Sequence, residues 1–262
     1  MLRSSHDGGR FTPEVDEPEW RYYPWRLPPI PMKTLPLHLL ALAFICLAPA
    51  FRADAKAPEK PHNYEKWEKE IAAYEQADAQ HPPAKGGIVF VGSSSIRLWK
   101  TLAQDFPQHR VLNRGFGGSE IADSAYFADR LVLPYEPRMV VLYAGGNDLN
   151  SRKPPEQVVA DFKAFFAKIR GRLPDSEIAY ISIAGNPARW AQVEKVKAVN
   201  AEIEAWLKEQ PRTKFINVFA RMLGDDGLPR PEIFVADKLH MNAEGYMLWA
   251  EVIRPFLPAP DR

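Results

Sequence analysis

The chain has 262 residues, with 34 Lys and Arg against 33 Asp and Glu, so its formal net charge is +1. A balance so close to neutral argues against a polyphosphate partner such as a nucleic acid, which needs a dense field of basic side chains. The single cysteine excludes a disulfide framework, an iron–sulfur cluster and a cysteine-rich zinc site. The hydrophobic fraction of 46% is that of an ordinary globular protein, whereas the 25 prolines are about twice the usual share of roughly 5%.

Residues 1–55 are predicted to precede the folded domain. The stretch 1–31 is interrupted by prolines at 13, 18, 24, 28, 29 and 31, so we expect it to be disordered or to lie upstream of a true start at Met32. From Met32 a lysine, an apolar run over 35–48 and small residues up to 55 follow in order, which is typical of a secretory signal peptide. A membrane anchor is the alternative, but the apolar run is shorter than the roughly 20 residues of a span. We therefore expect a periplasmic or secreted protein with no stable membrane anchor after cleavage.

The rest of the chain alternates helix and strand. After residues 56–62, the stretch 63–80 is predicted to be an amphipathic helix, because Tyr64, Trp67, Ile71 and Tyr74 recur at helical spacing. Short apolar runs predict buried strands at 88–91, 110–112, 139–143, 178–183 and 215–218, and helical patterns occupy 95–105, 119–131, 155–172, 188–209 and 242–255. This alternation indicates one α/β domain over 86–258, with a five-stranded parallel sheet covered on both faces. Ligands of such sheets bind at the carboxyl ends of the strands.

Three loops at predicted strand ends carry polar signatures. A serine cluster at 93–95 follows the first strand, glycines at 115, 117 and 118 follow the second, and Gly-Gly-Asn-Asp at 145–148 follows the third. A serine at a strand-to-helix turn can be a nucleophile or simply a helix cap. The glycines can expose backbone N–H donors or only form turns, and the asparagine can donate to an oxyanion or only reverse the chain.

A fourth loop, at 237–240, places Asp237 three residues before His240, just ahead of the last predicted helix. An acid and a histidine at this spacing fall on one side of a single turn, so the carboxylate can accept from Nδ1 and leave Nε2 free to act as a base. Of the six histidines, only His240 lies in a late loop beside a carboxylate.

Taken in this order, the four loops resemble the sequence blocks of the SGNH subgroup of GDSL-type serine hydrolases, over roughly residues 86–257. The resemblance implies a flavodoxin-like three-layer α/β/α fold and an esterase that needs no metal or organic cofactor. It implies Ser94 as nucleophile, His240 as general base and Asp237 as the residue that orients the imidazole. It also implies an oxyanion hole made by the backbone N–H groups of Ser94 and Gly118 and by the side chain of Asn147.

Two residues depart from the family pattern, because Ser93 and Ser119 stand where aspartate is usual or common. Neither position carries the nucleophile, the base or an oxyanion donor, but the serine at 93 removes a carboxylate that could organise its loop.

The segment after the fourth predicted strand suggests the substrate. Arg189 and Trp190 are candidate substrate-binding residues, and the tryptophan could stack on a sugar ring or pack under the following helix. Without an apolar insertion that resembles a lid, the loops favour short acyl groups on carbohydrate or small polar alcohols. The alternatives are a lysophospholipase or thioesterase of the same family, or a catalytically silent glycan-binding module of the cell envelope.

Overall fold

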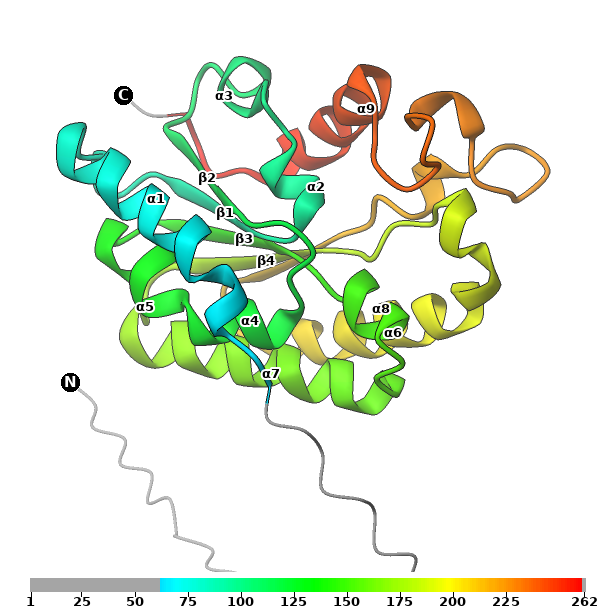
Figure 1. Cartoon of the computed structure of the whole chain (residues 1–262), viewed down its shortest axis with the longest axis horizontal. Helices are drawn as coiled ribbons and strands as arrows, with labels where there is room; N and C mark the ends of the chain where they lie inside the picture. Colours follow the sequence, from blue (N-terminus) through cyan, green and yellow to red (C-terminus); the bar gives the residue numbers. More distant parts are fainter. Residues whose placement is uncertain (1–61, 261–262) are drawn as a thin grey trace, which may run out of the picture. The chain divides into compact units, whose positions relative to one another are not determined.

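The computed structural model describes residues 62–260 (Figure 1). The predicted signal peptide and the segment upstream of it lie outside the described residues, so both stay predictions. The described part contains a five-stranded, all-parallel sheet in the order β2-β1-β3-β4-β5. Its strands are β1 (Ile88–Gly92), β2 (Val111–Gly115), β3 (Met139–Tyr143), β4 (Glu177–Ile181) and β5 (Thr213–Ile216). This order is that of flavodoxin-like folds, and the expected fold class is confirmed.

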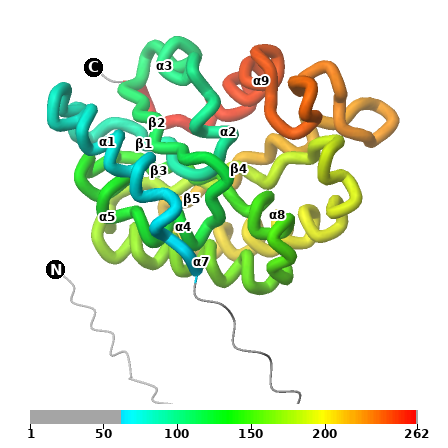
Figure 2. The backbone as a smooth tube through the Cα atoms, viewed as in Figure 1, coloured from blue at the N-terminus to red at the C-terminus, as the bar shows by residue number. Residues whose placement is uncertain are grey.

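Helices cover both faces of the sheet, and alternate strand residues face each layer (Figure 2). Val89 and Val91 of β1 pack into one hydrophobic cluster, while Ile88 and Phe90 pack into the other. The first layer contains α1 (Glu68–Gln80), α4 (Ile121–Tyr126), α5 (Ala128–Leu131), α7 (Pro155–Arg172) and α8 (Val193–Lys208). The second contains α2 (Ser94–Arg97), α3 (Leu102–Asp105) and α9 (Ala243–Ile253). The short helix α6 (Gly146–Asn150) follows β3 directly.

The central strands end level with one another, which brings their following loops to a single edge. Gly92, the last residue of β1, pairs with Gly115 of β2 on one side and with Tyr143 of β3 on the other. Gly92 has a φ of 133°, and a Cβ there would lie 2.0 Å from the carbonyl oxygen of Tyr143. Only glycine allows β1 to end so close to β3, and the serine cluster at 93–95 begins at the next residue.

Two of the predicted helices are each broken in two. The stretch 95–105 forms α2 and α3, because Trp99 turns its ring into the core and donates its indole N–H to Asp105 at 2.6 Å. The stretch 119–131 forms α4 and α5, which share Phe127 as a boundary residue. The helix predicted over 188–209 begins as a 3₁₀ turn, η3 (Pro187–Gln192), and becomes α-helical only at Val193.

Strand β2 is longer than predicted because its polar residues have partners elsewhere in the fold. The prediction stopped at Leu112, but the strand continues through Asn113 and Arg114. Asn113 donates to the carbonyl of Ile96 at 2.6 Å, and the Arg114 guanidinium lies 2.5 Å from the carboxylate of Asp78. Strands β4 and β5 each lie one or two residues earlier than predicted. In the described part of the chain, no helix has the length and apolar character needed to cross a membrane.

Candidate active site

The side chains of Ser94, His240 and Asp237 form a hydrogen-bonded series at the carboxyl edge of the sheet. Ser94 is the first residue of α2, directly after β1, and its Oγ lies 2.9 Å from Nε2 of His240. On the other side of the ring, Nδ1 lies 2.6 Å from Oδ2 of Asp237. The structure therefore brings together all three side chains that the sequence placed in the site. An imidazole held in this way can accept a proton from the serine hydroxyl.

The acid and the histidine share one tight turn. Oδ1 of Asp237 accepts the backbone N–H groups of Leu239 and His240, each at 2.9 Å. Lys238, between them, has a left-handed φ of 57°, which lets the chain reverse within the turn. Burial acts to raise the pKa of Asp237, but the hydrogen bonds from His240 and Leu239 outweigh it and lower the pKa to about 2. The carboxylate beside the imidazole is therefore charged at any pH near neutrality.

Helix α9 connects the histidine turn to the nucleophile helix. Asn242 caps α9 by accepting the N–H of Gly245 at 3.1 Å, and its amide donates to the carbonyl of Glu232 at 2.7 Å. One turn further, the hydroxyl of Tyr246 donates to the carbonyl of Ser95 at 2.9 Å. The elements that carry the base and the nucleophile are thus joined by side chains of one helix.

The oxyanion hole implied by the family resemblance consists of three hydrogen-bond donors, and it stays a prediction. The backbone N–H groups of Ser94 and Gly118 have no acceptor within the part of the chain that the structure describes. Gly118 has a φ of 70°, which turns this loop into the left-handed region. Asn147, in the first turn of α6, donates one N–H to the carbonyl of Ser119 at 2.9 Å and keeps the second. The set can donate to an oxygen that becomes negatively charged.

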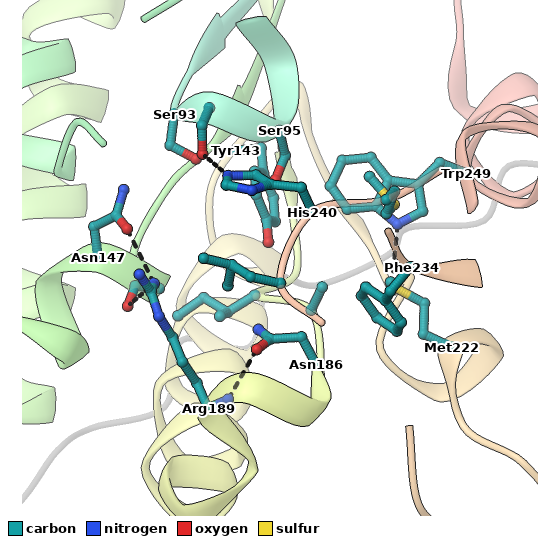
Figure 3. Close-up of a pocket in the computed structure, with 16 residues that line it drawn as sticks. Ser93, Ser95, Tyr143, Asn147, Asn186, Arg189, Met222, Phe234, His240 and Trp249 are labelled. Carbon is teal, nitrogen blue, oxygen red and sulfur yellow. Dashed lines mark hydrogen bonds between the residues drawn. The ribbon is translucent and has the colours of Figure 1, made fainter. Parts of the chain in front are cut away.

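Ser94, Asn147 and His240 open on a small cavity of about 30 Å³. One side of it is polar and includes Ser94, Asn147 and His240 (Figure 3). The other side is apolar and is formed by Ile183, Ala184, Met222, Phe234 and Trp249. Because one water needs about 10–15 Å³ of such space, the cavity has room for a group of only a few heavy atoms.

A buried ionic cluster lies next to the oxyanion donors. The carboxylate of Asp148, fully buried, accepts the N–H of Ile121 at 3.2 Å, and so ties α6 to the start of α4. Lys153 lies 2.9 Å from Glu120 and 3.5 Å from Asp148. Burial, together with the charge of Glu120, raises the pKa of Asp148 to about 6, although Lys153 opposes this rise. Lys153 thus contacts the carboxylates of both Glu120 and Asp148. Within residues 62–260, no three His, Cys, Asp or Glu side chains are grouped so that they could hold a metal ion.

The amino-terminal helix α1 holds the glycine loop from outside the sheet. The hydroxyl of Tyr74 donates to the carbonyl of Gly115 at 2.6 Å, and the carboxylate of Glu70 accepts the N–H of Gly117 at 3.3 Å. A Cβ at Gly118 would lie 3.4 Å from the ring of Trp67. The sequence predicted this helix but not its contact with the oxyanion loop. The only signal for it was the helical spacing of aromatic residues on one face.

Of the two predicted substrate-binding residues, only one lines the cavity. The half-buried Arg189 does so, and its Nη1 donates to the carbonyl of Gly146 and to Oδ1 of Asn147, each at 3.0 Å. Trp190 does not line it, so its contact with a substrate stays a prediction. Its half-buried ring stacks on Phe219, with centroids 6.3 Å apart, in an adjacent hollow. The apolar side chains after β5 offer the indole a better surface than water.

The two serines that depart from the family pattern are both buried. Ser119 donates its hydroxyl to the carbonyl of Phe116 at 3.0 Å, which closes the glycine loop on itself. At Ser93 the backbone fixes the loop, because its N–H donates to Tyr143 and its carbonyl accepts from Ile96 and Arg97. Neither loop depends on a carboxylate at these two positions for its observed hydrogen bonds.

A sequence model of the GDSL-like Lipase/Acylhydrolase family matches residues 88–248, and the chain therefore belongs to this family of hydrolases. No curated protein matches the sequence.

Solved structures share the fold. A Streptococcus pneumonia protein named for platelet activating factor is 19% identical, over 74% of this chain and 94% of its own, with a TM-score of 0.65. A GDSL-like lipase from Bacteroides thetaiotaomicron is 22% identical, over 74% and 96% of the two chains, with a TM-score of 0.57. A variant of an acetyl-xylooligosaccharide esterase from Geobacillus is 13% identical, over 69% and 98%, with a TM-score of 0.55.

Proposed function

We propose that this member of the family is a serine esterase that hydrolyses carboxylic esters through an acyl-enzyme on Ser94. The observation that carries the proposal is the series Asp237–His240–Ser94. Its serine and histidine line a cavity that Asn147, whose second side-chain N–H has no acceptor among residues 62–260, also lines. Serine is a weak nucleophile at neutral pH, and a base in hydrogen-bond contact with its hydroxyl is what makes it reactive. Following the predicted signal peptide, we also propose that the protein acts outside the cytoplasm.

In the first step, Nε2 of His240 takes the proton of Ser94 while Oγ attacks the ester carbonyl carbon. The carbonyl electron pair moves onto oxygen, and the tetrahedral intermediate collapses as the alcohol leaves with the proton from the imidazole. In the second step, water gives a proton to His240 and attacks the acyl carbon. Collapse of this intermediate returns the proton to Ser94 and releases the carboxylic acid. Asp237 holds the imidazole tautomer and stabilises its charged form throughout.

The negative charge of each intermediate would face the N–H groups of Ser94, Gly118 and Asn147. Donors fixed before the reaction need no reorganisation when the charge develops, and each contributes about two to three orders of magnitude in rate. The groups that hold these donors are hydrogen-bonded in the structure without a substrate. Glu70 binds the glycine loop, and Asp148 joins the helix of Asn147 to α4.

The acyl group that fits this site is short. A cavity of about 30 Å³ bounded by Met222, Phe234 and Trp249 has room for an acetyl group, whereas a long acyl chain needs a groove. The alcohol side is polar, because Asn186 and Arg189 line the same cavity. We therefore propose an ester of a carbohydrate or of a small polar alcohol. The Geobacillus enzyme of related fold, described as an acetyl-xylooligosaccharide esterase, supports this choice by analogy.

A fluorophosphonate probe tests the nucleophile. Incubation of the wild-type protein, followed by peptide mass spectrometry, is expected to locate one adduct on Ser94. The Ser94→Ala variant should give none, while the neighbouring variant Ser95→Ala should keep the adduct. If the folded wild-type protein stays unlabelled, the esterase proposal fails and a silent glycan-binding module becomes the better interpretation. An adduct on Ser95 in both the wild-type protein and Ser94→Ala would remove Ser94 from its role.

A panel of esters with one leaving group tests the acyl length. From acetyl to butyryl to octanoyl, we expect kcat/KM to fall steadily, because the cavity of about 30 Å³ has space for only a few heavy atoms of the acyl group. A maximum at octanoyl or longer would contradict the short-acyl proposal and favour a lysophospholipase. Acetylated xylo-oligosaccharide compared with ethyl acetate then measures what the sugar contributes.

A further inference from the structure

Arg189 lies in hydrogen-bond contact with a proposed catalytic group. It belongs to η3, which follows β4, and its Nη1 lies 3.0 Å both from Oδ1 of Asn147 and from the carbonyl oxygen of Gly146 (Figure 3). Because the guanidinium is positively charged and only donates, the atom of Asn147 that faces it must be the amide oxygen. The amide NH₂ then faces the opposite way, toward the carbonyl of Ser119.

This contact decides which end of the amide reaches the oxyanion hole. The two ends of an asparagine amide have nearly the same shape, and a half-turn about the last bond exchanges oxygen for NH₂. With the oxygen toward the hole, Asn147 would repel a developing negative charge instead of stabilising it. The carbonyl of Ser119 also favours the observed orientation, but a neutral hydrogen bond of this kind contributes about half as much as one with a charged partner.

The charge on Arg189 also acts through the amide. A hydrogen bond from a cation withdraws electron density from the amide oxygen, so the N–H on the same group becomes a stronger donor. No carboxylate lies within ion-pair distance of this guanidinium anywhere in residues 62–260, so its charge is not neutralised by a neighbouring acid. Burial lowers the pKa of Arg189, as expected for a cation without an acidic partner.

The backbone of η3 fixes Arg189 in this place. Oδ1 of Asn186 accepts the backbone N–H of Arg189 at 3.0 Å, and Pro187 restricts the first residue of the turn. The N–H of Ala188 donates to the carbonyl of Lys238, inside the turn that carries the histidine. The segment is thus tied to both halves of the site before any ligand binds.

We propose that Arg189 is a positioning residue of the oxyanion hole: it fixes and polarises the amide of Asn147 so that one N–H points at the reacting oxygen. The inference rests on the proposed esterase function and adds to it a residue that does not touch the reacting atoms. The contact joins two neighbouring segments of the sheet edge: η3, which follows β4, supplies the cation, and α6, which follows β3, supplies the amide.

The first test is kinetic, with a neutral acetate ester as substrate. Arg189→Met is expected to lower kcat by about 10- to 100-fold, the range for a charged hydrogen bond, and to change KM by less than about threefold. Arg189→Lys should recover part of the loss, because an ammonium can donate to Oδ1. The control Lys197→Met removes an exposed cation from α8 and should leave kcat unchanged.

A double-mutant cycle separates positioning from general loss of structure. Once Asn147→Ala has removed the amide, the added change Arg189→Met should lower kcat by less than about threefold. If the two losses multiply instead, Arg189 acts independently of Asn147 and the inference is wrong. If Arg189→Met mainly raises KM, the arginine binds substrate, which overturns the inference while leaving the esterase function intact.

A spectroscopic test does not depend on activity. In a ¹⁵N-labelled protein, the side-chain amide signals of Asn147 are identified by their disappearance in Asn147→Ala. We expect Arg189→Met to shift or broaden these signals and Lys197→Met to leave them unchanged. Unchanged signals in Arg189→Met would overturn the inference. Failure of the esterase proposal is recognised separately, by ester hydrolysis that survives Ser94→Ala.

Discussion

The two halves of the site are held in place in different ways. The acid–base half is local: Asp237 and His240 share one turn, and the aspartate side chain is 47% exposed. The oxyanion half is assembled over long distances in the sequence. Asn147 contacts residues 28 and 42 positions away, and the N–H of Gly117 donates to a carboxylate 47 positions away. The acid–base half depends on one turn. The oxyanion half depends on contacts among four helical segments, α1, α4, α6 and η3.

This difference matches what each half must do. A general base exchanges protons with water in every cycle, so exposure on one side is compatible with its role. Oxyanion donors act through fixed geometry in a water-poor setting, so they gain from rigid neighbours. Substitutions in the first half should therefore change the chemistry with little loss of stability, whereas substitutions around the second half should affect both.

The largest expected effect is in the acid–base half. His240→Ala should lower kcat/KM by about 10⁴-fold or more, because His240 is the only base hydrogen-bonded to Ser94 within residues 62–260, while Asp237→Ala should be less severe by about 10- to 100-fold. Steady-state hydrolysis of an activated acetate ester measures both. Thermal melting should show nearly unchanged stability for each. Equal losses in the two variants would mean that the aspartate does more than orient the ring.

The next effect is in the oxyanion half. Asn147→Ala should lower kcat by about 10²- to 10³-fold with a small change in KM, since its donor acts mainly in the transition state. It should also lower the melting temperature, because the amide joins α6 to the loop of Ser119. A fall in kcat below tenfold would show that the two backbone N–H groups suffice.

The pH profile compares the titrating groups of the two halves. Activity should fall toward acid pH, because a protonated imidazole at His240 cannot accept the proton of Ser94. The pKa of Asp237 is lowered to about 2, so its charge is present throughout and is lost only as the pH falls through about 2. The acid limb should therefore have unit slope.

Asp148, beside the oxyanion half, also changes its charge at mildly acid pH. Its pKa is raised to about 6, so in the folded protein it becomes charged only as the pH rises through about 6, whereas the unfolded chain ionises near 4. The contribution of this group to stability is therefore lost as the pH rises from about 4 to 6. The matched variant Asp148→Asn should keep the acid limb of activity. If the acid limb of the activity profile disappears in Asp148→Asn, the limb belongs to Asp148 and not to His240.

The smallest expected effect concerns the helix outside the family match. Glu70→Ala removes the carboxylate that accepts the N–H of Gly117 and should lower kcat by about two- to tenfold. Glu75→Ala is the control, because Glu75 lies on the same helix but pairs with Arg130 at the surface. If the two variants behave alike, α1 supports the fold and not the oxyanion loop.

The same contrast explains how much could be predicted from the sequence. The parallel sheet and the Asp237–His240 pair could be predicted because each pattern lies within a few consecutive residues, whereas Ser94 was selected from the serine cluster at 93–95 only by the family resemblance. The partner of Arg189 was not, since Asn147 is 42 residues away and nothing near either residue indicates the contact. The neighbour of Trp190 was not predictable for a related reason: Phe219, on which its ring stacks, comes from a different strand connection.

Ser94 and His240 are 146 residues apart, one after the first strand and the other just before the last helix. A chain in which α9 has not docked therefore has a sheet and a nucleophile but no base. Ester hydrolysis then requires the docking of α9, because Ser94 and His240 come from opposite ends of the folded part of the chain. Recovery of turnover after dilution from denaturant should lag behind the return of helical circular dichroism, and the delay would time the docking of the final helix.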